Sequence, residues 1–286
     1  MIVTRFAPSP TGYLHLGHAY AALFAHEWAL AKSGRFLLRL EDIDRARSRP
    51  HFAAAVLDDL RWLDLAWAEP VLVQSERLDA YSEALSRLDG EGLLYPCFCT
   101  RGEIAEEVAR AVEAPHGPEG PHYPGTCRAL SSAERKARVA SGFSYALRLD
   151  VRQAAMRAGA LAFEEEGEGP HGEHGSIGVD ATLFGDVVLA RKDTPASYHL
   201  AAVVDDAFQG VTLVTRGNDL FPATHIQRVL QALLGYSAPA YAHHKLILDG
   251  DGRKFSKRDH SATLKSLRAM GETPAHIRAR LGLTSR

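Results

Sequence analysis

The stretch APSPTGYLHLGH, residues 7–18, separates a short apolar segment from a long helical pattern and decides the fold. Residues 2–6 have the composition of a buried strand, which the two following prolines end. Apolar residues then recur at helical spacing over 17–33, and residues 35–40 predict a second strand. Together they predict a βαβ unit with a right-handed crossover and a parallel sheet. Ligands of such sheets bind beyond the carboxyl ends of the strands.

Two histidines, His15 and His18, stand where this helix is expected to begin. Side chains three apart on a first helical turn share one face, beside backbone N–H groups that have no partner within the helix. That arrangement suits an anion, and Gly17 lets a planar base or a ribose approach the backbone. The sequence has no G-x-G-x-x-G after the strand and no G-x-x-x-x-G-K-[ST], which excludes both of those nucleotide signatures. Taken alone, the pair is equally compatible with capping or core histidines.

A second motif, DGDGRKFSKR at residues 249–258, consists of a tight turn and a cationic loop with a serine. Alone it is compatible with a solvated basic surface. Together, the segments HLGH at 15–18 and KFSKR at 254–258 resemble the HIGH and KMSKS signatures of class I aminoacyl-tRNA synthetases. The resemblance implies an α/β catalytic domain with a Rossmann-like, doubly wound parallel sheet. It implies ATP binding by His15, Gly17, His18 and Lys257, and catalytic roles for His15, His18, Lys254 and Lys257.

Two further segments indicate which amino acid is activated. Residues 5–12 read RFAPSPTG and residues 38–44 read LRLEDID, and both resemble segments that line the amino-acid pocket of glutamate-specific synthetases. Ile43 departs from that pattern, which usually has threonine there. The resemblance implies that L-glutamate is bound by Arg5, Ser9, Glu41, Tyr198 and Arg216.

Both segments also have plain structural alternatives. Residues 41–50 alone read as an ordinary charged loop. Arg216 lies near the end of a strand predicted over 211–219, where a buried arginine could instead pair with a core carboxylate. We assign His199 and Asp206 to structural or supporting roles.

All three cysteines fall within residues 97–127. A disulfide is disfavoured, because a cytosolic setting is reducing and an odd count leaves one thiol over. Three thiolates and one more ligand would complete the tetrahedron of a structural Zn²⁺ site. By ligand chemistry the fourth ligand is His122 or His116. The truncated paralogues of glutamyl-tRNA synthetase, called glutamyl-queuosine tRNA(Asp) synthetases, carry C-x-C…Y-x-x-x-C with tyrosine as a ligand, and this resemblance implies Cys97, Cys99, Tyr123 and Cys127.

Composition fits a soluble globular protein. The chain has 286 residues and a net charge of −2, with no apolar run long enough to span a membrane and no signal peptide at its start. We therefore expect a cytoplasmic protein with no membrane partner, and a monomer. From Arg253 onward the sequence has nine Lys or Arg residues and only two acidic residues. This local basic stretch is suited to binding a polyanion.

Several segments are expected to be scaffold. Residues 51–88 predict mostly helix. The glycine-rich acidic segment 164–175 predicts a flexible, solvent-exposed loop without a site. The adjacent pair His243 and His244 has no partner at a usable spacing for a metal. Short helices are predicted around 264–270 and over 274–281.

Fewer than thirty residues follow the cationic loop, whereas ordinary glutamyl-tRNA synthetases continue with a helical anticodon-binding region. The resemblance to the truncated paralogues thus implies ATP-dependent formation of glutamyl-adenylate, with Mg²⁺ accompanying ATP, and transfer of glutamate to the queuosine base at the wobble position of tRNA(Asp). A conventional glutamyl-tRNA synthetase is the nearest alternative. More distant ones are a small-substrate nucleotidyltransferase, an inert tRNA-binding paralogue, and a ligase that places glutamate on a protein or metabolite.

We expect four parts along the chain. Residues 1–94 form the first half of the catalytic domain and residues 95–130 a zinc-binding insertion. Residues 131–248 form the second half, and residues 249–286 hold the KMSKS-type loop and a short helical tail without an anticodon-binding domain.

Overall fold

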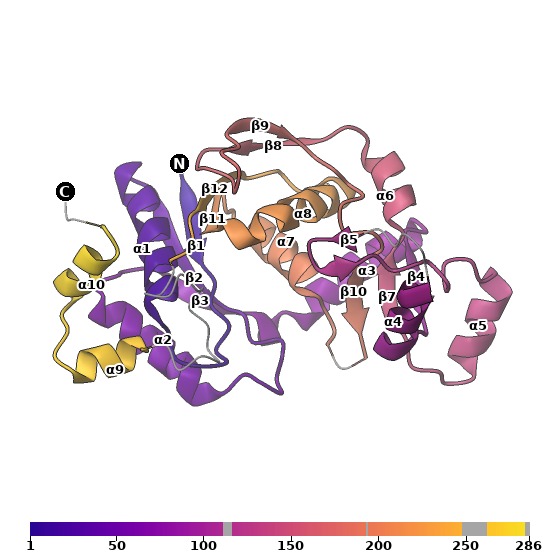
Figure 1. Cartoon of the computed structure of the whole chain (residues 1–286), viewed down its shortest axis with the longest axis horizontal. Coiled ribbons are helices and arrows are strands. Elements are labelled where there is room, and N and C mark those ends of the chain that lie inside the picture. The colour runs from indigo at the N-terminus through magenta and orange to yellow at the C-terminus, as the bar shows by residue number, and fades with distance from the viewer. Residues whose placement is uncertain (111–115, 193, 248–261, 284–286) are drawn as a thin grey trace.

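The structure is a computed structural model that describes residues 1–110, 116–192, 194–247 and 262–283. Figure 1 shows an elongated molecule. The first strands and the C-terminal helices lie at one end, and a small antiparallel sheet with its helices lies at the other.

The predicted βαβ unit is present. Strand β1 (Val3–Phe6) pairs in parallel with β2 (Arg35–Leu40), and helix α1 (Leu16–Ala31) connects them. The apolar residues of α1, with Leu23 fully buried, pack into a core shared with β2. The sequence pattern was sufficient here because the buried face of α1 is continuous and its two strands are almost wholly buried.

The prediction of mostly helix over 51–88 was wrong in one respect. A third parallel strand, β3 (Ala68–Val73), pairs with β2 between helices α2 (Pro50–Trp62) and α3 (Leu78–Gly90). Of this edge strand only Leu72 is buried, so it lacks the apolar run that marks a central strand. A short 3₁₀ turn, η1 (Gln74–Glu76), follows it.

The far end of the molecule is built on an antiparallel sheet. Strand β4 (Leu94–Cys97) pairs with β7 (Ala146–Leu149), which pairs with β10 (Val188–Arg191). The elements that surround this sheet are α4 (Arg101–Arg110), β5 (His116–Gly117), β6 (Gly120–Pro121), α5 (Ser132–Ala140) and α6 (Val151–Ala158).

A four-stranded sheet lies in the middle, in the order β11-β12-β8-β9. Strand β12 (Ala240–His244) pairs in parallel with both β11 (Leu213–Gly217) and β8 (Ala162–Glu165), and β9 (Gly175–Gly178) pairs antiparallel with β8. The backbone N–H of Thr212 donates to the Val3 carbonyl, with an N···O distance of 3.0 Å. This sheet therefore meets the first one at β1.

Two helices cover the central sheet, α7 (Tyr198–Phe208) and α8 (Phe221–Leu233), the latter preceded by the turn η2 (Asn218–Leu220). At the other end, the predicted short helices are confirmed as α9 (Leu264–Ala269) and α10 (Pro274–Arg280).

Figure 1 shows these C-terminal helices, in yellow, beside the indigo N-terminal half. Leu264, Leu267 and Ile277 enter the same core as α1. Within the described part of the chain, no helix combines the length and apolarity needed to cross a bilayer.

Candidate active site

The two histidines of the first motif cap helix α1 reciprocally. The Nδ1 atom of His15 accepts from the Gly17 N–H at 3.2 Å, and Nδ1 of His18 accepts from the His15 N–H at 3.2 Å. Their ring centroids are 3.8 Å apart. A Cβ on Gly17 would lie 3.1 Å from His15 Cε1, tighter than ordinary side-chain contacts, so the glycine makes room for this ring. The capping interpretation and the site interpretation are therefore compatible.

The chain returns to this helix start just after the second motif. Lys254 and Lys257 lie outside the described residues, but the segment that follows them is described. Thr263 forms a β-bridge with His15, and the N–H of Leu264 donates to the Leu14 carbonyl at 2.8 Å. The described segment that begins at residue 262 is thereby held beside His15.

Three of the predicted residues, Ser9, His18 and Glu41, line one cavity of about 420 Å³. It lies beyond the carboxyl ends of β1 and β2, where a parallel sheet presents its ligand groups. The backbone N–H of Glu41 donates to the Pro8 carbonyl at 3.0 Å, which joins the two predicted pocket segments. The remaining lining residues are Phe6, Ala7, Pro8, Thr11, Asp44 and Arg47.

A buried ion network lies behind this cavity. Arg5 Nε and Arg39 Nη1 both donate to Asp206 Oδ1, at 2.9 and 2.7 Å. Arg39 also contacts Glu41 Oε1 at 3.4 Å. Burial alone would raise the pKa of Asp206, but the two arginines outweigh it and hold that pKa below its usual value. Arg5, predicted to bind glutamate, is therefore held by Asp206, whose assigned supporting role fits.

Burial acts in the opposite direction on Glu41. It raises the pKa of the Glu41 carboxyl, and the charges of Arg39 and Arg5 offset only part of that effect. An ammonium group placed beside Glu41 would favour its ionised form.

Arg216 is buried near the end of β11 and has no carboxylate within ion-pair distance among the described residues. Its Nη1 donates to Gln227 Oε1 at 2.7 Å and to the Tyr198 hydroxyl at 3.3 Å, and its Nη2 donates to Thr224 Oγ1 at 2.7 Å. The structure thus brings the predicted pair Arg216 and Tyr198 together. A buried guanidinium surrounded by neutral acceptors is costly unless an anion joins it.

A carboxylate, Glu165, is linked to the Arg216 guanidinium through the imidazole of His243. Nε of Arg216 donates to His243 Nε2 at 3.2 Å, and His243 Nδ1 contacts Glu165 Oε2 at 2.6 Å. Because Arg216 can only donate, Nε2 must be the acceptor and Nδ1 carries the proton. Glu165 Oε1 also accepts from the backbone N–H groups of His243 and Gly167.

These contacts correct one prediction. The exposed loop predicted over 164–175 includes Glu165, which is 1% exposed at the end of β8. His243 has a hydrogen-bond partner in Glu165, which leaves the prediction about a metal partner as it was. A lone carboxylate in an acidic, glycine-rich run carries no local sign of burial, because strand pairing across 78 residues places it. The sequence reading also gave no role to Arg39, Thr224 or Gln227.

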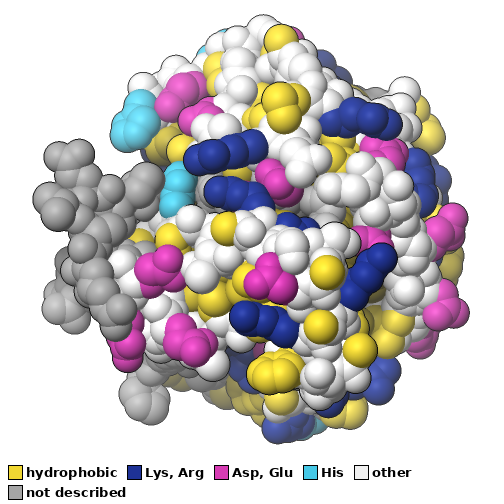
Figure 2. Space-filling view, turned by 90° about the vertical axis from the view of Figure 1, so that its right-hand side faces the viewer, with side chains coloured by type: hydrophobic (Ala, Val, Ile, Leu, Met, Phe, Trp, Pro, Cys, Tyr) yellow, Lys and Arg dark blue, Asp and Glu magenta, His cyan; other side chains and the backbone are white. Residues whose placement is uncertain are grey.

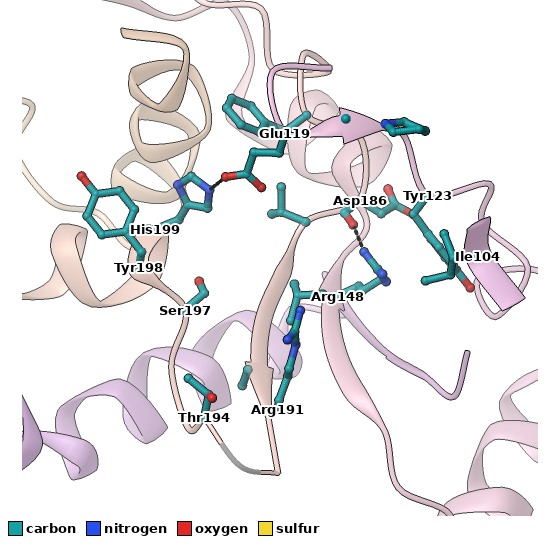
Figure 3. A pocket seen from close by; sticks show the side chains of 16 residues that line it. Ile104, Glu119, Tyr123, Arg148, Asp186, Arg191, Thr194, Ser197, Tyr198 and His199 are labelled. Carbon is teal, nitrogen blue, oxygen red and sulfur yellow. Dashed lines mark hydrogen bonds and ion pairs between the residues drawn. The ribbon is translucent and has the colours of Figure 1, made fainter. Parts of the chain in front are cut away.

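A second cavity, of about 370 Å³, adjoins Tyr198 (Figure 3). In Figure 3, Ser197, Thr194 and Arg191 lie on one side, and Arg148 donates to the Asp186 backbone carbonyl at 2.6 Å. His199 lies at the left beside Tyr198, with its Nε2 3.4 Å from Glu119 Oε1. The hydrogen bond to His199 lowers the pKa of Glu119.

The three cysteines converge. The Sγ atoms of Cys97, Cys99 and Cys127 lie within 4.8 Å of one another, compared with the about 3.8 Å edge that Zn–S bonds of about 2.3 Å give in a tetrahedron. The Tyr123 hydroxyl lies 3.4 Å from Cys99 Sγ and accepts from the Cys127 N–H at 2.8 Å. His122 is instead turned to the Leu183 carbonyl, 2.9 Å from its Nε2. Of the candidates named for the fourth position, Tyr123 is the one whose described contacts face the thiols.

Two members of this cluster resist ionisation. Burial raises the pKa of the Cys99 thiol to about 12, and burial raises the pKa of Tyr123 as well. Burial also opposes ionisation of Cys127, but its hydrogen bonds with Tyr123 and the Phe98 N–H outweigh that effect and lower its pKa. Three clustered sulfurs supply the soft donors that zinc takes in closed structural sites, and the phenol oxygen would complete the set as a harder fourth ligand.

The comparisons with known proteins agree with this arrangement. The family model described as tRNA synthetases class I (E and Q), catalytic domain, matches residues 1–285. A Glutamyl-Q tRNA(Asp) synthetase from Rhodobacter capsulatus is 51% identical, over 99% of this chain and 100% of its own length. A protein of the same name from Symbiobacterium thermophilum is 44% identical, over 100% of this chain and 87% of its own length.

A solved structure agrees as well. The glutamate tRNA ligase from Elizabethkingia meningosepticum, in complex with its amino acid, has a TM-score of 0.74 and 28% identity, and the match covers 90% of this chain and 52% of that one. The chain thus belongs to the class I tRNA synthetase catalytic-domain family for glutamate and glutamine, and within it to the glutamyl-Q tRNA(Asp) synthetases.

Proposed function

We propose that this enzyme activates L-glutamate with ATP and transfers the glutamyl group to the queuosine base at the wobble position of tRNA(Asp). The observation that carries the proposal is the cavity lined by Ser9, His18 and Glu41, in a chain aligned over its whole length with a glutamyl-Q tRNA(Asp) synthetase. The chemistry follows in two steps.

In the first step a carboxylate oxygen of glutamate attacks the α-phosphorus of ATP. The bond from that phosphorus to the oxygen bridging the α- and β-phosphates breaks, and pyrophosphate leaves with the electron pair. Because charge spreads over the phosphate oxygens, catalysis rests on positioning and electrostatic stabilisation. His15 and His18 contact the ATP phosphates and adenosine, Gly17 admits the nucleotide, and Lys254 and Lys257 hold the departing pyrophosphate. Mg²⁺ would neutralise phosphate charge, held mostly by phosphates and water.

Glutamate lies between the two arginines. Glu41 receives its ammonium group, and Arg5 and Arg216 face its carboxylates, with Ser9 and the Tyr198 hydroxyl adding hydrogen bonds. Arg216 supports this role because it is buried without a direct acidic partner among the described residues. The unpartnered Nε2 of Gln227 lies on the side chain that already accepts from Arg216, a second buried donor available to an anion.

In the second step a nucleophilic group of the queuosine base attacks the acyl carbon of the adenylate. AMP leaves, and the acceptor's proton is released with it. We place the acceptor in the cavity of Figure 3, because Tyr198 lines it and also touches Arg216, which joins it to the glutamate pocket.

We further propose that Cys97, Cys99, Tyr123 and Cys127 hold one structural Zn²⁺. The donor set fits, since the three sulfurs and the phenol oxygen converge. Bound there, zinc would hold β4 to the loop that carries Tyr123 and Cys127, so it would contribute to folding rather than to chemistry.

The organisation of the chain is also proposed. The first sheet and the parallel strands of the central sheet would together form the Rossmann-like doubly wound sheet, and the four parts 1–94, 95–130, 131–248 and 249–286 would be arranged as expected. We infer a cytoplasmic monomer.

Charging assays test this function. Purified protein with ATP and radiolabelled glutamate should glutamylate tRNA(Asp) that carries queuosine and should leave the same tRNA without queuosine unlabelled. Ribonuclease digestion of the labelled tRNA identifies the site of attachment, because the label should leave with a fragment of the anticodon loop and not with the 3′ terminal adenosine. Charging of the queuosine-free tRNA at its 3′ end would replace the proposal with a conventional glutamyl-tRNA synthetase.

A further inference from the structure

Two adjoining cavities on the antiparallel end of the molecule are lined by cations, and no acidic side chain lines them among the described residues. One, of about 680 Å³, is bordered by Arg101, Arg148 and Tyr145, and the other, of about 430 Å³, by Phe143. Arg191 and Lys192 line both. We call these six residues the cationic aromatic surface. None of its four cations has an acidic side chain within ion-pair distance among the described residues.

Its aromatic side chains are unusually open. Phe143 is 59% exposed and Tyr145 37% exposed. Both rings contact Phe98, with centroids 6.4 and 5.9 Å apart, and the Arg138 guanidinium lies 5.6 Å from the Phe98 ring. A single exposed aromatic side chain is ordinary. Exposed rings beside cations that have no acidic partner can stack against planar groups while the cations bind an anionic chain.

The surface continues into the proposed active site. Arg148 and Arg191 also line the cavity of Figure 3, which Tyr198 borders. Figure 2 looks at this end of the molecule and shows Lys and Arg side chains, in dark blue, beside exposed hydrophobic ones in yellow, with acidic side chains in magenta between them. No described residue that lines the two cavities is acidic, so the cationic aromatic surface is positively charged although the whole face carries both signs.

We propose that the cationic aromatic surface binds the unpaired nucleotides of the tRNA anticodon loop that flank the modified base. Unpaired RNA bases are read by stacking on aromatic rings and arginine planes, and their phosphates are held by Lys and Arg. Duplex RNA would expose no base faces to Phe143 and Tyr145. The inference rests on the proposed function, because that function places the wobble base in the adjoining cavity.

Binding of an anticodon stem-loop RNA of tRNA(Asp) to the full chain tests the surface. Phe143→Ala should raise the dissociation constant about 5- to 100-fold, which is the loss of affinity expected when one base no longer stacks. Arg191→Ala and Lys192→Ala should each weaken binding and lower the slope of log affinity against log salt by about 0.7. Phe208→Ala, which removes a ring of 68% exposure on α7, and Lys32→Ala at the end of α1 are matched controls and should leave affinity unchanged.

Glutamate-dependent pyrophosphate exchange, measured with saturating tRNA, shows that the Phe143 and Lys192 variants are folded and active, and in these two it should match the parent protein. RNA affinity equal to that of the parent protein in the Phe143 and Lys192 variants would overturn the inference. A protein would then be the favoured partner for this surface. Failure of the parent protein to charge tRNA(Asp), with RNA affinity still dependent on these residues, would overturn the proposed function alone.

Discussion

Glu165 and His243, 78 residues apart in the chain, lie 2.6 Å apart with both side chains fully buried. The same imidazole accepts a hydrogen bond from Arg216 on its other nitrogen. The carboxylate therefore sets the tautomer and orientation of His243, and His243 sets the position of the guanidinium. Desolvation and the nearby Arg216 charge lower the pKa of His243 more than its hydrogen bond to Glu165 raises it, which keeps the bridging ring neutral.

We predict that Glu165→Gln raises the KM for glutamate at least about tenfold, a loss in the range of hydrogen bonds to charged groups. The amide carries no charge to balance Arg216, and its NH₂ group allows the other histidine tautomer. Pyrophosphate exchange at varied glutamate and varied ATP measures the effect, and the KM for ATP should stay within twofold. Ile177→Ala on the paired strand β9 is the control, because it loosens the same hairpin without touching this chain of contacts. A fall in kcat with an unchanged KM would reduce Glu165 to a structural role.

Gly17→Ala should reduce the rate of glutamyl-adenylate formation without destabilising the protein. A methyl group there meets the His15 ring at 3.1 Å, whereas alanine favours a helix by up to about 1 kcal/mol over glycine. Single-turnover adenylate formation and urea unfolding report the two effects separately. Gly90→Ala at the end of α3 is the control, because nothing lies within 4 Å of the new methyl group. It should leave the rate of adenylate formation unchanged. A parent-like rate in the Gly17 variant would contradict a close approach of ATP to this helix start.

Lys257→Ala is expected to slow glutamyl-adenylate formation at least about a hundredfold. Loss of one donor that acts in the transition state typically costs about 3–4 kcal/mol. Lys245→Ala is the control. It removes the positive charge of an exposed lysine that follows strand β12 and lies outside the second motif. Rapid quench of the first turnover measures both variants, and equal rates would refute the role of Lys257.

Tyr123→Phe should lower the affinity for zinc while the fold is retained at saturating metal. The substitution removes the hydroxyl that faces the thiols and keeps the ring, which packs against Arg148 at 4.1 Å. Competition with a chromophoric chelator gives the affinity, and mass spectrometry under native conditions gives the stoichiometry. His122→Ala is the matched variant and should bind zinc normally, because His122 is turned to Leu183. The opposite pattern would make the histidine the fourth ligand.

Asp59 makes the stability of the fold depend on pH. This carboxyl is 4% exposed on α2, and burial raises its pKa to about 6, with opposing pull from Arg268. Because the folded pKa lies above the unfolded value of about 3.9, its contribution to stability is full below about pH 4 and is lost as pH rises through about 6. Asp59→Asn should therefore unfold with a free energy higher by up to about 2 kcal/mol at pH 8, after solvent screening is allowed for, and equal to the parent's at pH 4.

Urea unfolding at both pH values measures this difference. Asp58→Asn changes the exposed neighbour on the same helix and should show little pH-dependent difference. A gain for Asp59→Asn that persists at pH 4 would point to packing rather than to ionisation.

Much of the site could be predicted because its residues lie in short local motifs. His15, Gly17 and His18 share one helical turn, Ser9 and Glu41 follow neighbouring strands, and a parallel sheet brings those strand ends together. Cys97, Cys99 and Cys127 were sufficient to indicate a metal site because thiols are rare in this chain. Strand β3 escaped detection because an exposed edge strand has little apolar periodicity.

The sequence by itself determined the βαβ unit and the family, and it indicated which residues to propose for the nucleotide and amino-acid pockets, since these rest largely on short local motifs. Only the tertiary structure decided that Glu165 balances Arg216 through His243, that Asp206 holds Arg5, and that Tyr123 rather than His122 faces the thiols. Those contacts depend on strand pairing and side-chain direction between distant segments. Local composition carries no record of them, because a buried carboxylate and an exposed one are the same residue until the fold removes one from water.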